Sequence, residues 1–200
     1  DRMRWNGLSL ALFVGLSVAA AGCGGSGGNT AHREPLTARS LYPMGPHYVW
    51  TFDIDTQTGM SSLGITRVIA MEGQAVRIAA DGGEQHTYEL RDEGIYRPET
   101  STWLLRDPIA VGQEWPSTLG RTAHVTSVSE VVDVTAGHFT DCVEVVEDGG
   151  DSGLHVRTVY CQGIGPVIVE SRQELVTSMT GGITVVGRLR AYQTEPEEEF

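Results

Sequence analysis

The chain has 200 residues, of which 40% are hydrophobic, and its 14 basic and 26 acidic residues give a formal charge of −12 at pH 7. Nucleic acids and anionic lipid head groups attract basic surfaces, so this acidic composition argues against both as partners. Without the N-terminal segment and the acidic C-terminus, about 150 residues are left, which suits one domain of ordinary size.

The first 22 residues have the layout of an export signal. Arg2 and Arg4 supply positive charge, and residues 8–21 form an apolar stretch of 14 residues that ends in small side chains before Cys23. A helix needs roughly 20 apolar residues to cross a bilayer, so this stretch is too short for a permanent anchor. The layout predicts a cleavable signal peptide over residues 1–22.

The last residues of the predicted signal peptide resemble a known processing motif. The segment Ala20-Ala21-Gly22-Cys23 resembles the lipobox of bacterial lipoproteins. The resemblance implies cleavage between Gly22 and Cys23 and a lipid on the Cys23 thiol, with each buried methylene contributing about 0.8 kcal/mol to membrane attachment. The alternative is ordinary signal cleavage after Ala21 or Gly22, which would leave Cys23 as a free thiol.

The residue after the cysteine bears on location. Gly24 stands at the position where an aspartate marks inner-membrane retention in enteric bacteria. We therefore expect a lipid-anchored protein of the cell envelope, with the outer membrane facing the periplasm favoured over the inner membrane or the cell surface.

The chain divides into four predicted parts. Glycine and serine dominate residues 24–29, which is the composition of a flexible coil, and charged and turn-forming residues continue to Ser40. The acidic run near the C-terminus is expected to stay solvated. The predicted parts are a signal peptide at 1–22, a flexible tether at 23–40, a β-domain at 41–192 and an acidic disordered tail at 193–200.

Alternating apolar and polar residues mark strands along the domain. Tyr48, Trp50, Phe52 and Ile54 alternate with smaller or polar neighbours, a period of two that is typical of a strand with one buried face. No stretch after Cys23 has helical spacing with caps. Further strands are predicted at 63–71, 75–80, 85–91, 122–134, 139–146, 154–161, 166–178 and 183–192. We expect an all-β fold, an antiparallel meander of about ten strands in a strongly curled or barrel-like sheet.

Cys142 and Cys161 are the cysteines of the predicted domain. An exported protein folds in an oxidising compartment, which favours a disulfide between them, worth roughly 3 kcal/mol in the chain-entropy model. They flank a glycine-rich turn, so a hairpin would place them opposite each other. The alternative is two reduced cysteines in the core. The neighbouring pairs in this hairpin would be Val143 with Tyr160 and Val145 with Thr158.

Three glycines are predicted at structural turns. Gly137 permits a positive φ at a tight turn before the strand that Phe139 restarts. Gly163 and Gly165 are expected to form a bulged corner between two strands. A phosphate-binding loop is excluded here because no helix follows.

The order of several short motifs resembles uncharacterised β-rich envelope lipoproteins and domains of unknown function. These motifs are Tyr42-Pro43 before Trp50, residues 134–139 before Cys142, and residues 160–167. Together they span most of residues 41–192. The resemblance implies a fold and a location but no established reaction.

No set of residues forms a recognisable catalytic or metal-binding motif. The six histidines show no paired spacing with cysteine or acidic residues, and no serine lies in a Gly-x-Ser-x-Gly elbow. Asp53 and Asp55 are expected to be solvated rather than an acid–base pair. Asp148 and Asp151 resemble a calcium loop only in composition. We therefore expect no enzyme activity, no cofactor and no metal, although a metal site assembled only in three dimensions stays open.

Two functions are consistent with these sequence features. The first is an interaction or structural module of the envelope that docks another protein, which we favour because side chains fill small barrels more simply than ligands do. The alternative is a carrier or binding protein for a lipid or another small hydrophobic ligand. The expected partners are the membrane through the anchor, an envelope protein or a hydrophobic ligand, and no nucleic acid.

Overall fold

The computed structural model describes residues 35–174 and 182–194. The folded unit begins at Pro35. The predicted signal peptide, its cleavage site between Gly22 and Cys23, and the lipid attachment at Cys23 lie outside the described residues, as do residues 195–200 of the predicted tail.

The described residues form one antiparallel sheet of 12 strands, accompanied by one short helix and one 3₁₀ turn. It is all-β as predicted, with 12 strands in place of about ten. The added strands lie between residues 94 and 116, where short segments interrupted by turns carry no long alternation. In chain order the elements are α1 (Ala38–Leu41), β1 (Val49–Thr56), β2 (Ser61–Glu72), β3 (Ala75–Ala80), β4 (Gln85–Arg91), β5 (Gly94–Arg97), β6 (Thr102–Arg106), β7 (Glu114–Pro116), η1 (Thr118–Gly120), β8 (Thr122–Val134), β9 (Gly137–Asp148), β10 (Leu154–Cys161), β11 (Gly165–Gln173) and β12 (Ile183–Gln193).

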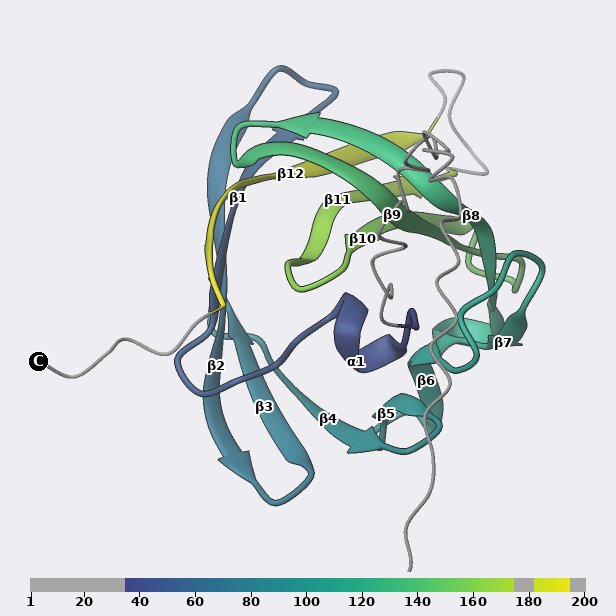
Figure 1. Cartoon of the computed structure of the whole chain (residues 1–200). Coiled ribbons are helices and arrows are strands. Elements are labelled where there is room, and N and C mark those ends of the chain that lie inside the picture. The colour runs from purple at the N-terminus through teal and green to yellow at the C-terminus, as the bar shows by residue number, and fades with distance from the viewer. Residues whose placement is uncertain (1–34, 175–181, 195–200) are drawn as a thin grey trace, which may run out of the picture. The chain divides into compact units, whose positions relative to one another are not determined.

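The sheet curls into a nearly closed barrel. Its strand order is β6-β5-β4-β3-β2-β1-β12-β11-β10-β9-β8-β7, so the first and last strands pair in the middle of the sheet. The two edge strands, β6 and β7, are consecutive in the chain and contact each other without forming a ladder. Figure 1 shows the resulting ring of strands. We call the line between β6 and β7 the seam.

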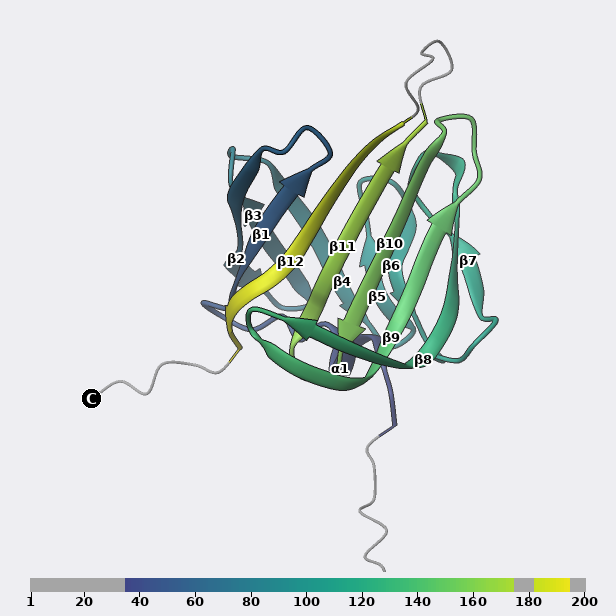
Figure 2. The same ribbon diagram turned by 90° about the horizontal axis from the view of Figure 1, so that it is seen from above.

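Because consecutive strands alternate in direction, their connections fall at two opposite ends of the barrel. The β2–β3, β4–β5, β6–β7, β8–β9 and β10–β11 connections lie at the end that holds α1. Figure 2 shows the β8–β9 and β10–β11 connections beside α1. The β1–β2, β3–β4, β5–β6, β7–β8 and β9–β10 connections lie at the other end, where β11 also ends and β12 begins, and we call this end the mouth.

The helix α1 fills its end of the barrel. Thr37 caps it, accepting a hydrogen bond from the Ser40 amide in a capping box. Ala38 and Leu41 are fully buried, and the Ala38 amide donates to Asp107 Oδ1 at 2.8 Å. The expectation of no capped helix after Cys23 is therefore wrong, because a single turn is too short to show helical periodicity. Residues 35–40, assigned to the tether from the sequence, belong to the folded unit.

Two aromatic side chains, Tyr42 and Trp50, pack beneath α1. The Trp50 indole is fully buried and donates to the Ile164 carbonyl at 2.6 Å, and the Tyr42 ring meets it edge-on with centroids 5.0 Å apart. Gly165, at φ +110°, lies directly against this pair: a Cβ there would be 2.8 Å from Trp50 Nε1. Gly163, at φ +77°, sits in the preceding turn, where its amide donates to the Ser40 carbonyl at 2.7 Å. Both glycines thus join the β10–β11 turn to this end of the barrel.

A disulfide joins Cys142 of β9 to Cys161 of β10, with Cα atoms 4.3 Å apart. The flanking pairs are the predicted ones, Val143 with Tyr160 and Val145 with Thr158. Beyond the disulfide, the β8–β9 hairpin reaches across neighbouring strands to β12 (Figure 2). There the Ala136 amide donates to the Leu189 carbonyl at 3.1 Å. Gly137 follows at φ +147° as the first residue of β9.

Candidate ligand-binding site

An apolar cavity of about 470 Å³ lies at the mouth, on the β1, β2, β3, β11 and β12 side of the barrel. Its walls come from the face of the sheet that also carries the buried Phe52. We call it the apolar cavity. Its lining residues are Phe52, Ile54, Ser62, Leu63, Gly64, Ile65, Thr66, Ala80, Asp81, Val169, Ser171, Val185 and Gly187.

Small side chains keep this cavity open. Ile54 of β1 lies between Ser62 of β2 and Gly187 of β12 in the ladder, and Phe52 lies opposite Gly64. Towards α1 the same strands instead bring large buried side chains together, such as Trp50. The sequence therefore places large side chains near α1 and small side chains near the mouth. As a result, the α1 end of the barrel is filled and the mouth is hollow.

The opposite face of the same strands carries ion pairs. Asp53 accepts from Arg190 at 2.8 Å, and Asp55 accepts from Arg188 at 3.0 Å. The hydrogen bond from Arg190 lowers the pKa of the Asp53 carboxyl. Each carboxylate thus has its own arginine on the outside of the barrel, which is a structural arrangement and not an acid–base pair.

A buried polar cluster lies on the other side of the barrel, at the mouth end of the seam. Glu147 of β9 accepts a hydrogen bond from Ser117 and forms ion pairs with Arg121 at 3.3 Å and with Arg97 at 3.8 Å. The Glu147 and Arg121 side chains are 9% and 6% exposed. We call Arg97, Ser117, Arg121 and Glu147 the polar cluster.

The polar cluster holds more positive than negative charge. It has two guanidinium groups, on Arg97 and Arg121, against the single Glu147 carboxylate. Arg121 also donates from Nε to the Thr118 carbonyl at 3.1 Å and from Nη2 to Thr118 Oγ1 at 2.7 Å. Its Nη1 is buried without a hydrogen-bond partner, as is Trp115 Nε1, among the described residues. Buried donors of this kind normally have a partner, so these two atoms require water or another group beside them.

A second cavity of about 250 Å³ adjoins the polar cluster through Arg97. We call it the polar cavity. Burial raises the pKa of the Tyr88 hydroxyl, while nearby Arg97 partly opposes that rise. The Tyr88 hydroxyl therefore stays protonated and available as a donor. The lining residues of the polar cavity are His86, Thr87, Tyr88, Arg97, Glu99, Thr100 and Thr118.

Two more buried tyrosines lie close to these groups. Burial raises the pKa of both Tyr42 and Tyr160, and the charges of Glu147 and Arg97 act on Tyr160 with opposite signs. Both hydroxyls are neutral at physiological pH. The interior beside the polar cluster therefore presents neutral tyrosine hydroxyls together with the guanidinium groups of Arg97 and Arg121.

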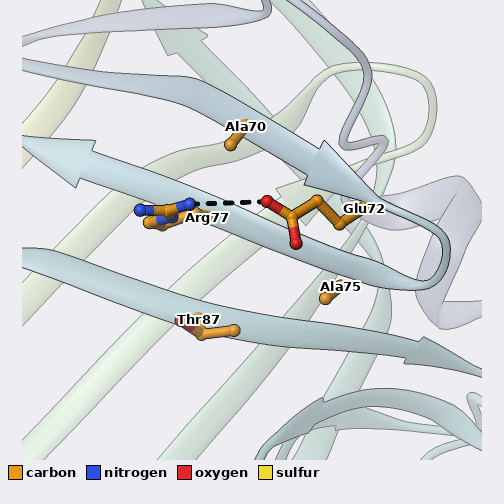
Figure 3. A pocket seen from close by; sticks show the side chains of 5 residues that line it. All are labelled: Ala70, Glu72, Ala75, Arg77 and Thr87. Carbon is orange, nitrogen blue, oxygen red and sulfur yellow. Dashed lines mark ion pairs between the residues drawn. The ribbon is translucent and has the colours of Figure 1, made fainter.

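A third hollow, of about 310 Å³, lies on the outer face of β2, β3 and β4 (Figure 3). Ala70 and Ala75 leave a shallow depression there, and Arg77 pairs with Glu72 at 3.8 Å across it. The Glu72 side chain is 80% exposed. One solvated ion pair over two alanines gives neither a nucleophile nor an apolar enclosure, so this hollow is not the candidate site.

Within residues 35–174 and 182–194, no group of three or more histidine, cysteine, aspartate or glutamate side chains is placed to hold a metal ion. The same described residues contain no helix with the length and apolar character needed to span a membrane.

The predicted site residues and the candidate site lie apart. Gly163, Gly165 and Gly137 are near the α1 end, and the disulfide lies between β9 and β10. The sequence analysis missed the polar cluster and both cavities. Glu147 and Arg121 carry no motif, and the only available signal was the charged Glu147 directly after the apolar pair Val145 and Val146.

Comparison with known proteins gives no family. No family model matches the chain, and neither does any curated protein. Two solved structures are similar: a candidate exported protein with a YmcC-like fold from Bacteroides fragilis, with 12% identity and a TM-score of 0.49, and a candidate lipoprotein from Parabacteroides distasonis, with 12% identity and a TM-score of 0.43. Each likeness covers 76% of this chain and 98% of the other. At this level of likeness, the two structures assign neither a family nor an activity to this chain.

Proposed function

We propose that this chain is a non-catalytic binding module of the bacterial cell envelope that holds a small hydrophobic molecule in the apolar cavity. The observation that carries the proposal is the hollow mouth of a barrel whose other end is filled by α1. This favours the carrier or binding function over the filled barrel that we expected first from the sequence.

The size and lining of the apolar cavity support this function. Ligand pockets commonly enclose about 300–1,000 Å³ and are mostly apolar with a few polar groups, and the apolar cavity, at about 470 Å³, falls in that range. Ile54, Val169 and Val185 supply apolar surface, and Ser62 and Ser171 supply hydroxyls. Removing apolar surface from water contributes about 25 cal/mol per Å² to the free energy of binding. An aliphatic ligand is therefore expected to occupy this apolar cavity more favourably than water does.

A neutral fluorescent probe tests the proposal. N-phenylnaphthylamine should bind the full chain saturably, and Gly187→Leu should weaken that binding at least tenfold by filling the cavity. Gly187 suits this purpose because a Cβ there makes only ordinary contacts, the nearest being Phe52 Cβ at 3.8 Å.

The matched control is Ala70→Leu, which adds a similar side chain to the outer hollow of Figure 3. This variant should bind the probe as the wild type does. Equal probe binding by the wild type and Gly187→Leu would contradict the proposal.

The envelope location rests on the N-terminal sequence. A lipid on Cys23 would hold the barrel at a membrane, with the outer membrane facing the periplasm as the favoured site. Intact mass and membrane fractionation of the wild type and Cys23→Ser test this directly. A lipid-sized mass increment and membrane association, both lost in the variant, are expected; an unmodified soluble product in both would contradict the anchor.

A second candidate function, protein docking, is favoured by exposed apolar side chains around the mouth. Met60, Leu119 and Ile183 are 68%, 66% and 51% exposed. Met60 and Leu119 lie in the β1–β2 and β7–β8 connections at the mouth, and Ile183 is the first residue of β12 at the same end. Exposed apolar patches often mark interaction surfaces. Replacing all three with serine should abolish specific cross-links in cells if this surface docks a protein, and should leave N-phenylnaphthylamine binding intact. Unchanged cross-links would reject the docking function.

A further inference from the structure

The Arg97 guanidinium makes only long contacts within the polar cluster, and its hydrogen bond to the Tyr88 hydroxyl is to a neutral group. Its Nη1 lies 3.4 Å from Ser117 Oγ, and its Nη2 lies 3.8 Å from Glu147 Oε1. The first is a long hydrogen bond and the second is beyond hydrogen-bond range, since charge-assisted N–H···O bonds are typically about 2.7–2.9 Å. The Arg97 side chain is 18% exposed, and it is the one residue shared by the polar cluster and the lining of the polar cavity.

The Glu147 carboxylate is already satisfied without Arg97. Ser117 donates to Oε2, and Arg121 Nη2 lies 3.3 Å from the same oxygen. One guanidinium and one hydroxyl therefore neutralise and solvate this carboxylate. The guanidinium of Arg97 is left as the surplus charge of the polar cluster, at the edge of a cavity.

The polar cavity surrounds this charge with hydrogen-bond donors. Tyr88 supplies a hydroxyl that burial keeps protonated, and Thr100 and Thr118 supply two more. The cavity also contains one carboxylate, Glu99, whose Oε1 accepts from the Thr87 amide at 3.2 Å. A planar guanidinium with hydroxyl donors around it fits a carboxylate or a phosphate group.

The two cavities lie on neighbouring strands at the same end of the barrel. Ala80, the last residue of β3, lines the apolar cavity, and His86, near the start of β4, lines the polar cavity. In the β3–β4 ladder, Ile78 pairs with His86, so the β3–β4 hairpin forms part of both walls. A molecule with an apolar part and a polar end would meet both kinds of wall at the mouth.

We propose that the polar cavity beside Arg97 binds the carboxylate or phosphate head group of an amphiphile whose apolar part occupies the apolar cavity. This inference rests on the proposed function and adds the class of ligand, an anionic amphiphile. The acidic composition argued against anionic lipid head groups as partners, and the proposal departs from that expectation only for one head group at the Arg97 guanidinium. Arg97 is the residue that recognises the head group, and Tyr88, Thr100 and Thr118 complete its hydrogen bonding.

Ligands that differ only in the head group test this assignment. Laurate, lauryl phosphate and lauryl alcohol share one alkyl chain, and each can displace N-phenylnaphthylamine from the full chain. The wild type should bind laurate and lauryl phosphate at least tenfold more tightly than lauryl alcohol. Arg97→Gln should remove that preference and leave the affinity for lauryl alcohol within twofold, which also shows that the variant is folded. Arg97→Lys keeps the charge and should retain part of the preference.

Arg91→Gln is the matched control. Arg91 lies on the outer face of β4, where it pairs with Glu89 and stacks over Tyr96 at 3.5 Å from the ring centroid. This variant should keep the full preference for anionic ligands. This control distinguishes the specific effect of losing the Arg97 charge from the general effect of removing one arginine from the barrel.

The outcomes distinguish the head-group assignment from the proposed function. Tight binding of lauryl alcohol and laurate with equal affinity, or an unchanged preference in Arg97→Gln, would overturn the assignment and leave the apolar cavity as a binding site. Failure of all three ligands and of the neutral probe would reject the proposed function itself. Inorganic phosphate tests whether the polar cavity binds a free anion instead of the head group of an amphiphile. Saturable phosphate binding without any preference for laurate over lauryl alcohol would also overturn the assignment.

Discussion

Arg97 Nη2 and Glu147 Oε1 lie 3.8 Å apart across the interior of the barrel, although their strands stand near opposite edges of the sheet. No backbone ladder joins β6 to β7 at the seam. Side chains of the polar cluster therefore connect the two edges at the mouth. At the α1 end, the Ala38 amide makes a corresponding contact with Asp107, in the loop that links β6 to β7.

Glu147→Gln should destabilise the barrel strongly. The substitution removes the carboxylate that Arg121 and Arg97 share, and breaking a buried ion pair typically costs about 3–5 kcal/mol. Denaturant unfolding measures the change. Glu72→Gln is the matched control, because its partner Arg77 lies at the same 3.8 Å but the Glu72 side chain is 80% exposed. We expect no measurable change in the control, and similar stability of the two variants would show that the polar cluster does not secure the seam.

Reduction of the disulfide should lower the free energy of unfolding by about 3 kcal/mol, because the bond closes a loop between residues separated by 19 positions. Denaturant unfolding with and without a thiol reductant measures this difference. The variant carrying both Cys142→Ala and Cys161→Ala should be insensitive to reductant. Identical unfolding of the oxidised and reduced wild type would contradict a stabilising role.

Gly165→Ala should cost more stability than Gly163→Ala. Both residues have positive φ, but a Cβ at Gly165 would come 2.8 Å from Trp50 Nε1, whereas nothing lies within 4 Å of one at Gly163. The backbone strain alone costs about 1–2 kcal/mol, and the clash adds to it only at Gly165. Thermal unfolding compares the variants, and equal losses would show that Trp50 does not require this close approach.

The buried tyrosines should make the protein sensitive to alkaline pH. Burial raises the pKa of Tyr42, Tyr88 and Tyr160 above the usual value of about 10. The folded state therefore holds these protons more tightly than the unfolded state, so the contribution to stability is complete below about pH 10 and is lost above it. In an absorbance titration, part of the tyrosine ionisation should be delayed until unfolding.

Replacing the same three tyrosines with phenylalanine should remove the delayed part of the titration curve. Far-ultraviolet circular dichroism at each pH identifies the onset of unfolding. Complete ionisation of all tyrosines in a protein that is still folded would contradict the buried positions of these hydroxyls.

Long alternating segments made much of the fold predictable. Strands β3, β4, β8 and β10 have the predicted bounds, and the pairing of β9 with β10 follows from two cysteines on either side of a glycine-rich turn. The short strands β5, β6 and β7 were missed because only a few residues lie between their turns. Strands β5 and β6 extend the sheet from β4, strand β7 pairs with β8, and further contacts join β5 to α1 and β6 to β7. Local sequence does not encode these long-range contacts.

The candidate site was not predictable from the sequence, for a physical reason. Arg97, Arg121 and Glu147 lie on separate strands or connections and meet only because the sheet curls until its edges approach. Likewise, Gly64 and Gly187 face the same cavity from strands more than a hundred residues apart in the sequence. The register predicted for neighbouring strands gives no measure of that curvature, so neither cavity could be placed.

Native mass spectrometry of the full chain, extracted from membranes of a bacterial host, tests the central claim most directly. The wild type should carry one bound apolar molecule that denaturing extraction releases, and Gly187→Leu, purified in parallel, should not. An apolar molecule that is absent from both, or equally retained by both, would contradict a ligand site in the apolar cavity at the mouth.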